Sequence, residues 1–113
     1  MNRPIFRPAV IAFLGLSIVG ATRAEDLSTY TITLKNHRFT PAEIHVPTGK
    51  PFFVLITNAD DTADEFEMSA PAIEKVIPPG EQGKVRIRPL GPGHFRFFGD
   101  FHQDTAQGAF ISE

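Results

Sequence analysis

The feature that most constrains this chain is a succession of short hydrophobic runs, each closed by Pro, Gly, Asn or Asp. Apolar and polar residues alternate with a period of two in residues 30–34 and 84–88, as in strands with one buried and one wet face. The runs recur at a spacing of ~8–12 residues, which is typical of a β-sandwich. Because no segment after residue 24 has helical periodicity, the pattern predicts an all-β, Greek-key sandwich of about eight short strands.

The predicted strands lie at residues 30–34, 42–46, 52–57, 65–68, 74–77, 84–88, 94–98 and 109–112. Residues 52–57 are nearly all apolar, which indicates a strand buried on both faces. Residues 78–80, Pro-Pro-Gly, are a strong turn signal. Since the sequence contains no repeat, low-complexity tract or linker, it predicts one domain.

The first 24 residues have the pattern of a secretory leader. Arg3 and Arg7 precede an apolar run at residues 9–19, and small residues follow up to Ala24. The apolar run is shorter than the ~20 residues that a membrane-spanning helix needs. We therefore expect a signal peptide at residues 1–24, cleaved near Ala24, and an exported domain at residues 25–113. The alternative is a leader that is kept as an anchor.

Composition limits the partners of residues 25–113. The leader carries three of the eleven basic residues, so this domain has eight Lys or Arg against thirteen Asp or Glu, a net charge of −5. A negative domain is a poor partner for nucleic acid, which needs clustered Lys and Arg, but it suits a small cation. The chain has no cysteine, so disulfides, thiolate metal sites and cysteine nucleophiles are excluded.

Two segments carry side chains that could bind a metal ion. Glu65 and Glu67 lie on a predicted strand, and Asp100 and His102 lie in the loop after another strand. Alternation places Phe66 in the core and both glutamates on the opposite face. Carboxylates with one imidazole form a site suited to Fe(II) or Mn(II) and, less selectively, to Zn(II) or Cu(II). The alternative interpretation is that the glutamates form the solvated face of an edge strand and that His102 is a loop histidine in water.

The remaining candidates are weaker. His37, His45 and His94 are expected at the surface, and Met68 is expected to fill the core. A glycosidase that used Glu65 and Glu67 as its acid/base pair would need a sugar cleft. Because 89 residues without tryptophan leave little room for such a cleft, we expect no hydrolytic site.

Three stretches resemble the cupredoxin-like domains of bacterial periplasmic ferrous-iron uptake systems. Residues 39–49 match the pattern F-x-P-x-x-I-x-V-P-x-G, residues 63–68 contain Glu-Phe-Glu, and residues 97–102 read Phe-Phe-Gly-Asp-Phe-His. The first stretch is common to many cupredoxins, whereas the second and third together are more specific. The resemblance covers essentially all of residues 25–113 and implies a cupredoxin-like sandwich.

This chain departs from copper-binding cupredoxins at the metal ligands. His102 is retained, but Gly99 stands where the cysteine thiolate would be and Ala106 about where the axial methionine would be. Asp64 or Glu65, depending on the register, stands near the position of the first histidine. The soft copper ligands are thus replaced by a glycine, an alanine and carboxylates.

The resemblance implies a periplasmic protein that binds iron as Fe(II) or Fe(III) through Glu65, Glu67, Asp100 and His102, with copper or manganese as alternatives. It also implies transfer to a membrane iron permease, together with a second periplasmic iron-binding protein. Oxidation of Fe(II) before transfer, a carrier without redox chemistry, and a metal-free interaction module are the three alternatives for function. Four ligands leave an octahedral iron two short, so water, a partner or a second copy in a homodimer would complete the site.

Overall fold

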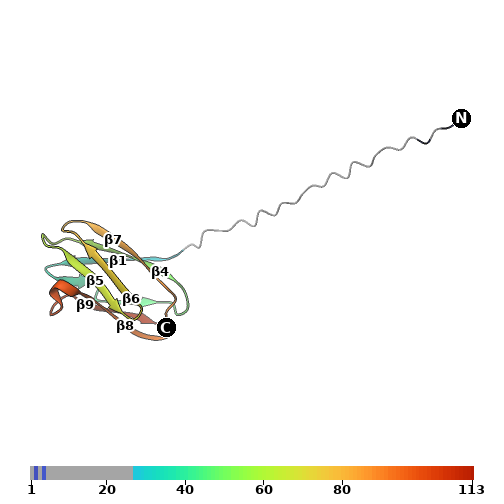
Figure 1. The fold of residues 1–113 in the computed structure, drawn as a ribbon. Helices are drawn as coiled ribbons and strands as arrows, with labels where there is room; N and C mark the ends of the chain where they lie inside the picture. Colours follow the sequence, from blue (N-terminus) through green and yellow to red (C-terminus); the bar gives the residue numbers. More distant parts are fainter. Residues whose placement is uncertain (1, 3, 5–26) are drawn as a thin grey trace.

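The protein folds into two β-sheets that pack face to face around one core (Figure 1). The computed structural model describes residues 2, 4 and 27–113. One sheet has the strand order β2-β1-β4-β7 and the other has the order β3-β9-β8-β5-β6. The strands are β1 (Thr29–Lys35), β2 (Arg38–Thr40), β3 (Glu43–Val46), β4 (Phe52–Asn58), β5 (Asp64–Ser69), β6 (Ala72–Ile77), β7 (Gln82–Ile87), β8 (Gly93–Gly99) and β9 (Gln107–Ser112).

The predicted all-β sandwich is confirmed, and each of the eight predicted runs coincides with a strand. The ninth strand, β2, was not predicted because it has only three residues. A tight turn joins it to β1, in which Asn36 and His37 have φ angles of 51° and 56°. Such turns usually contain Asn-Gly, so the pair Asn-His gave no turn signal.

The expectation that residues 52–57 are buried on both faces was wrong. In β4, Phe52, Val54 and Ile56 are buried, while Phe53 and Leu55 are only half-buried. The Lys84 ammonium lies 4.2 Å from the centre of the Phe53 ring on this outer face. Apolar residues on the outer face are therefore covered in part by long side chains rather than by a second layer.

The predicted signal peptide at residues 1–24 and its cleavage near Ala24 lie outside the described residues, apart from residues 2 and 4. Within the part that is described, no helix is long and apolar enough to span a membrane.

Aromatic side chains fill the space between the sheets. The rings of Phe66, Phe97 and Phe110 follow one another at centroid distances of 5.4 and 4.9 Å. Gly108 lies opposite Phe97 in the β8–β9 pairing, and a Cβ at residue 108 would overlap that ring. A glycine is therefore required at this position. The contact fixes β9 against β8 and so holds the loop between them.

That loop lies at the end of the sandwich opposite the point where β1 begins (Figure 1). It contains a 3-10 turn, η1 (Asp100–His102), directly after β8. The β1–β2 turn reaches the same end. There the Asp60 carboxylate, in the loop after β4, accepts hydrogen bonds from the backbone N–H groups of Asn36 and His37 at 2.6 and 2.9 Å. Three connections are thus gathered at one end of the fold.

Candidate metal centre

Strand β5 presents different chemistry on its two faces. Asp64, Phe66 and Met68 point into the core and are buried, while Glu65 and Glu67 are half-buried on the outer face of the five-stranded sheet. This alternation confirms the predicted faces of Phe66, Glu65 and Glu67. Since β6 covers the edge beyond it, β5 is an interior strand. The interpretation of Glu65 and Glu67 as an edge-strand face is therefore wrong.

Three carboxylates converge on the outer side of β5. Glu65, Glu67 and Asp100 each offer an oxygen, and these oxygens lie within 4.8 Å of one another. Asp100 is brought there because Glu67 pairs with Phe98 of β8, two residues before η1 begins. The Gln103 side-chain amide donates a hydrogen bond of 2.7 Å to Asp100 Oδ1. We call Glu65, Glu67 and Asp100 the acidic cluster.

The electrostatics of the acidic cluster favour a bound proton or cation. Desolvation raises the pKa of Glu67, and the negative charges of Asp100, Glu74 and Glu65 raise it further. Glu74 contributes because it lies directly opposite Glu67 in the β5–β6 pairing. The nearby like charges disfavour the ionised form of Glu67. A divalent cation between the carboxylates would remove that repulsion.

The inner side of β5 holds a different carboxylate. Asp64 is only 2% exposed. Its Oδ1 accepts hydrogen bonds from the N–H groups of Glu65 and Phe101 at 2.8 and 3.1 Å, and its Oδ2 lies 2.9 Å from His102 Nδ1. Because a carboxylate only accepts, His102 Nδ1 carries the hydrogen and Nε2 is the ring nitrogen left for another bond. Asp64 thus ties β5 to η1.

Gly99 and Ala106 close the space beside this pair. A Cβ at residue 99 would lie 2.6 Å from Asp64 Oδ2 and 2.8 Å from the Ala106 Cβ. The Gly99 N–H donates to the Ala106 carbonyl at 2.9 Å, so the two backbones are held together. A cysteine side chain at residue 99 would overlap the carboxylate. We call Asp64, Gly99, His102 and Ala106 the filled pocket.

His37 departs from the prediction that it is an ordinary surface histidine. Its ring stacks on the His102 ring with centroids 3.7 Å apart and planes 12° apart. The side chain is 38% exposed, but Nδ1 is buried, 3.5 Å from Asp60 Oδ2 and without a hydrogen-bond partner among the described residues. Burial alone would raise the pKa of Asp60, yet the backbone donors of His37 and Asn36 outweigh it and lower that pKa.

The other predictions for single residues are confirmed. His45 and His94 are exposed, and Met68 is 1% exposed in the core. His45 Nδ1 lies 2.6 Å from a carboxylate oxygen of Glu113. That hydrogen bond, with the nearby charges of Glu113 and Glu43, raises the pKa of His45 against the opposing effect of desolvation.

Three of the four predicted ligands are therefore brought together and the fourth is not. Glu65, Glu67 and Asp100 form the acidic cluster, whereas His102 is bound through Nδ1 to Asp64 in the filled pocket. Sequence reasoning missed the partnership of Asp64 and His102. The alternation of β5 did place Asp64 inward, and a buried carboxylate requires donors. The loop histidine was an available donor.

Comparison with known proteins identifies the family. A family model described as the cupredoxin-like domain matches residues 8–111. The chain belongs to the cupredoxin-like family. The uncharacterized protein RP394 of Rickettsia prowazekii (strain Madrid E) is 46% identical over an alignment 116 positions long. The alignment covers 97% of this chain and 93% of that relative.

Solved cupredoxin structures share the fold at low sequence identity. The metal-binding domain of the Cu(I)-exporting P-type ATPase CopA of Streptococcus pneumoniae D39, solved with Cu(I), has a TM-score of 0.68 at 18% identity. The match covers 75% of this chain and 84% of that one. Auracyanin A, a blue copper protein of Chloroflexus aurantiacus, has a TM-score of 0.65 at 12% identity, over 75% of this chain and 98% of its own.

The residues of this cupredoxin-like chain do not fit the copper centre that its fold suggests. A blue-copper site needs a cysteine thiolate and two imidazoles. Here the sequence has no cysteine, and the filled pocket places the Asp64 carboxylate within 2.6 Å of where a side chain on residue 99 would begin. The space for a soft ligand is taken by a hydrogen-bonded carboxylate. The family therefore accounts for the fold, while the residues at this position do not provide a blue-copper ligand set.

Proposed function

We propose that this protein binds Fe(II) at the acidic cluster and carries it in the periplasm toward a membrane iron permease. The observation that carries the proposal is the convergence of Glu65, Glu67 and Asp100 within 4.8 Å, on a cupredoxin-like frame whose copper position is filled. Oxygen ligands suit Fe(II) and Mn(II) better than Cu(I). Copper and manganese remain the competing ions.

The geometry supports loading and release rather than permanent storage. The three carboxylate residues are all half-buried, so a bound ion would keep contact with water or with a receptor. Three carboxylates leave an octahedral ion with open positions. Water, a second copy of the chain, the permease or a second periplasmic protein would supply the remaining ligands. Such a site can pass its ion on when a partner offers a better set of ligands.

His102 has two roles under this proposal. Its Nδ1 bond to Asp64 fixes the ring and holds η1, which carries Asp100, against β5. A histidine held by a carboxylate in this way is the usual arrangement of a metal-ligating imidazole, with the other nitrogen facing the metal. Nε2 is the ring nitrogen left for another bond, but His102 lies outside the acidic cluster, so its part as a fourth iron ligand stays a prediction.

We further propose that the bound Fe(II) is oxidised to Fe(III) before transfer. Anionic oxygen ligands stabilise Fe(III) relative to Fe(II), so bound Fe(II) loses one electron more readily than the hydrated ion. The electron requires an acceptor. Dioxygen or a redox centre of the partner would take it, because the chain has no cysteine with which to hold a metal–sulfur centre. A carrier without redox chemistry would use the same residues and differs only in this step.

Anaerobic calorimetry with Fe(II) tests the proposal. We expect saturable binding that Glu65→Ala and Asp100→Ala each weaken by about tenfold or more. Glu81→Ala, at an exposed position that is not part of the cluster, is the matched control and should bind as the unaltered protein does. His102→Ala reports whether Nε2 adds a ligand.

Oxygen consumption on admitting air then separates oxidation from simple transport. Uptake of oxygen that depends on Fe(II) and is lost in Glu65→Ala supports oxidation, and its absence supports a carrier. A folded protein that gives no heat with Fe(II) would contradict both and favour the metal-free interaction module.

A further inference from the structure

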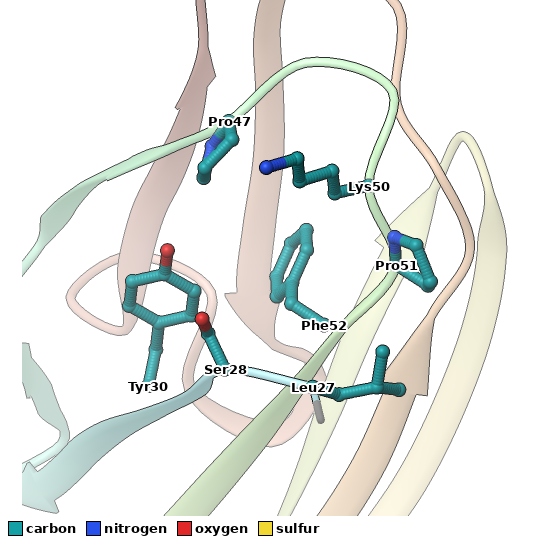
Figure 2. A pocket seen from close by; sticks show the side chains of 7 residues that line it. All are labelled: Leu27, Ser28, Tyr30, Pro47, Lys50, Pro51 and Phe52. Carbon is teal, nitrogen blue, oxygen red and sulfur yellow. The ribbon is translucent and has the colours of Figure 1, made fainter. Parts of the chain in front are cut away.

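A pocket of about 270 Å³ lies at the other end of the sandwich from the acidic cluster. It opens where β1 and β4 begin, and these two strands run parallel, so their far ends lie beside the Asp60 loop and the β1–β2 turn. Figure 2 shows the residues that line it, which are Leu27, Ser28, Tyr30, Pro47, Lys50, Pro51 and Phe52. Nothing in the iron proposal uses this pocket.

The walls of the pocket are apolar and held in place. Phe52 is buried and its ring packs edge-on against the Tyr30 ring at a centroid distance of 5.4 Å. The Gly49 N–H donates to the Leu90 carbonyl at 2.9 Å, and the Phe53 N–H donates to the Ser28 carbonyl at the same distance. These bonds fix the loop that carries Lys50 and the segment that leads into β1. The pocket is thus preformed, as most small-molecule sites are.

The polar groups around the pocket are free to bind a ligand. Within residues 27–113, no hydrogen bond or ion pair engages the Lys50 ammonium or the hydroxyls of Tyr30 and Ser28. Figure 2 shows the Lys50 ammonium and the Tyr30 hydroxyl directed toward the same space. Among residues 27–113, no carboxylate lines the pocket. One cation and two hydroxyl donors therefore face an apolar floor.

We propose that this pocket binds a small organic monocarboxylate with an apolar body. Lys50 would pair with the carboxylate, the Tyr30 hydroxyl would donate a hydrogen bond to it, and the apolar body would lie against Phe52 and the two prolines. A single cation matches one negative charge better than a multiply charged phosphate. The volume matches a compact ring or a branched chain.

Titration of the isotopically labelled protein with benzoate, followed by amide NMR, tests this inference. We expect saturable shifts confined to the pocket amides, and an affinity that falls about fivefold or more in Lys50→Gln. Lys84→Gln is the matched control, because Lys84 lies on the outer face of the four-stranded sheet, and it should leave benzoate binding unchanged. Benzamide, which has the same ring but no charge, should bind at least fivefold more weakly.

Three results would overturn the inference: no saturable shift with benzoate, an equal loss of affinity in both lysine variants, or equal binding of benzamide. Because the pocket and the acidic cluster share no residue, failure here leaves the iron proposal intact. Failure of Fe(II) to bind would likewise leave this pocket unaffected.

Discussion

The two faces of β5 carry carboxylates in different environments, one inside the fold and the others on its surface. On the inner side, Asp64 is buried, and each of its oxygens is hydrogen-bonded to the protein. On the outer side, oxygens of Glu65, Glu67 and Asp100 lie within 4.8 Å of one another, and the pKa of Glu67 is raised. The inner carboxylate is stabilised by hydrogen bonds within the protein, whereas the outer carboxylates concentrate negative charge that a proton or cation would neutralise. The same chemical group therefore stabilises the fold on one side and, under our proposal, binds the metal ion on the other.

The largest effect is expected on the inner side. Asp64→Ala should lower the free energy of unfolding by about 3 kcal/mol, because it leaves the partly buried His102 imidazole and the Phe101 N–H without their acceptor. Urea denaturation measures the loss. Asp61→Ala, an exposed neighbour, is the control and should change little. A loss below about 0.5 kcal/mol for Asp64→Ala would contradict the role of Asp64 in tying β5 to η1.

Gly99→Ala should destabilise the protein by about 1–3 kcal/mol through overpacking, since its Cβ would meet the Asp64 carboxylate. In an Asp64→Ala background the same substitution should cost less, because the obstructing carboxylate is gone. A double-mutant cycle from urea denaturation measures this coupling. Strictly additive losses would show that residues 64 and 99 do not compete for the same space.

On the outer side, Glu67→Gln should weaken Fe(II) binding on the order of tenfold while the protein stays folded. The affinity of the unaltered protein should also fall as the pH is lowered. Because the pKa of Glu67 is raised, protons begin to compete with the metal at a higher pH than they would at an ordinary glutamate. Calorimetry across a pH series measures both effects. Affinity that is independent of pH down to the ordinary glutamate pKa would argue against Glu67 as a ligand.

The smallest effect concerns the metal-free protein. The raised pKa of Glu67 means that the folded state holds this proton more tightly than the unfolded chain does. The stabilisation from that proton is complete below the unfolded pKa and is lost as the pH rises through the folded pKa. Glu67→Gln should therefore raise the melting temperature at neutral pH and have less effect in acid. Thermal melts of both proteins with a chelator present would check this, with Glu81→Gln as the control. A lower melting temperature for Glu67→Gln at neutral pH would contradict the repulsion in the cluster.

The fold was predictable because its main signals are local. Alternation in residues 30–34 and 84–88 and the turn at residues 78–80 each required only neighbouring residues, and all fell where expected. β2 was missed because the turn before it places His37 at positive φ, and a histidine is not a residue from which a positive φ is predicted. Local patterns therefore sufficed for the strands and failed for one turn.

The site was only partly predictable because its contacts are long-range. The period of β5 placed Glu65 and Glu67 on one face, and the resemblance added the loop with Asp100. Spacing alone could not show that His102 would turn toward Asp64, 38 positions earlier, or that His37 would stack on it. These contacts depend on how three connections meet at one end of the sandwich.

Anomalous diffraction from crystals soaked anaerobically in Fe(II) tests the central claim most directly. Data collected on both sides of the iron absorption edge would locate the ion without assumptions about its ligands. We predict a peak between the carboxylates of Glu65, Glu67 and Asp100 on the outer side of β5. A peak inside the filled pocket, displacing Asp64 from His102, or no peak beside a cluster free of lattice contacts, would contradict the account.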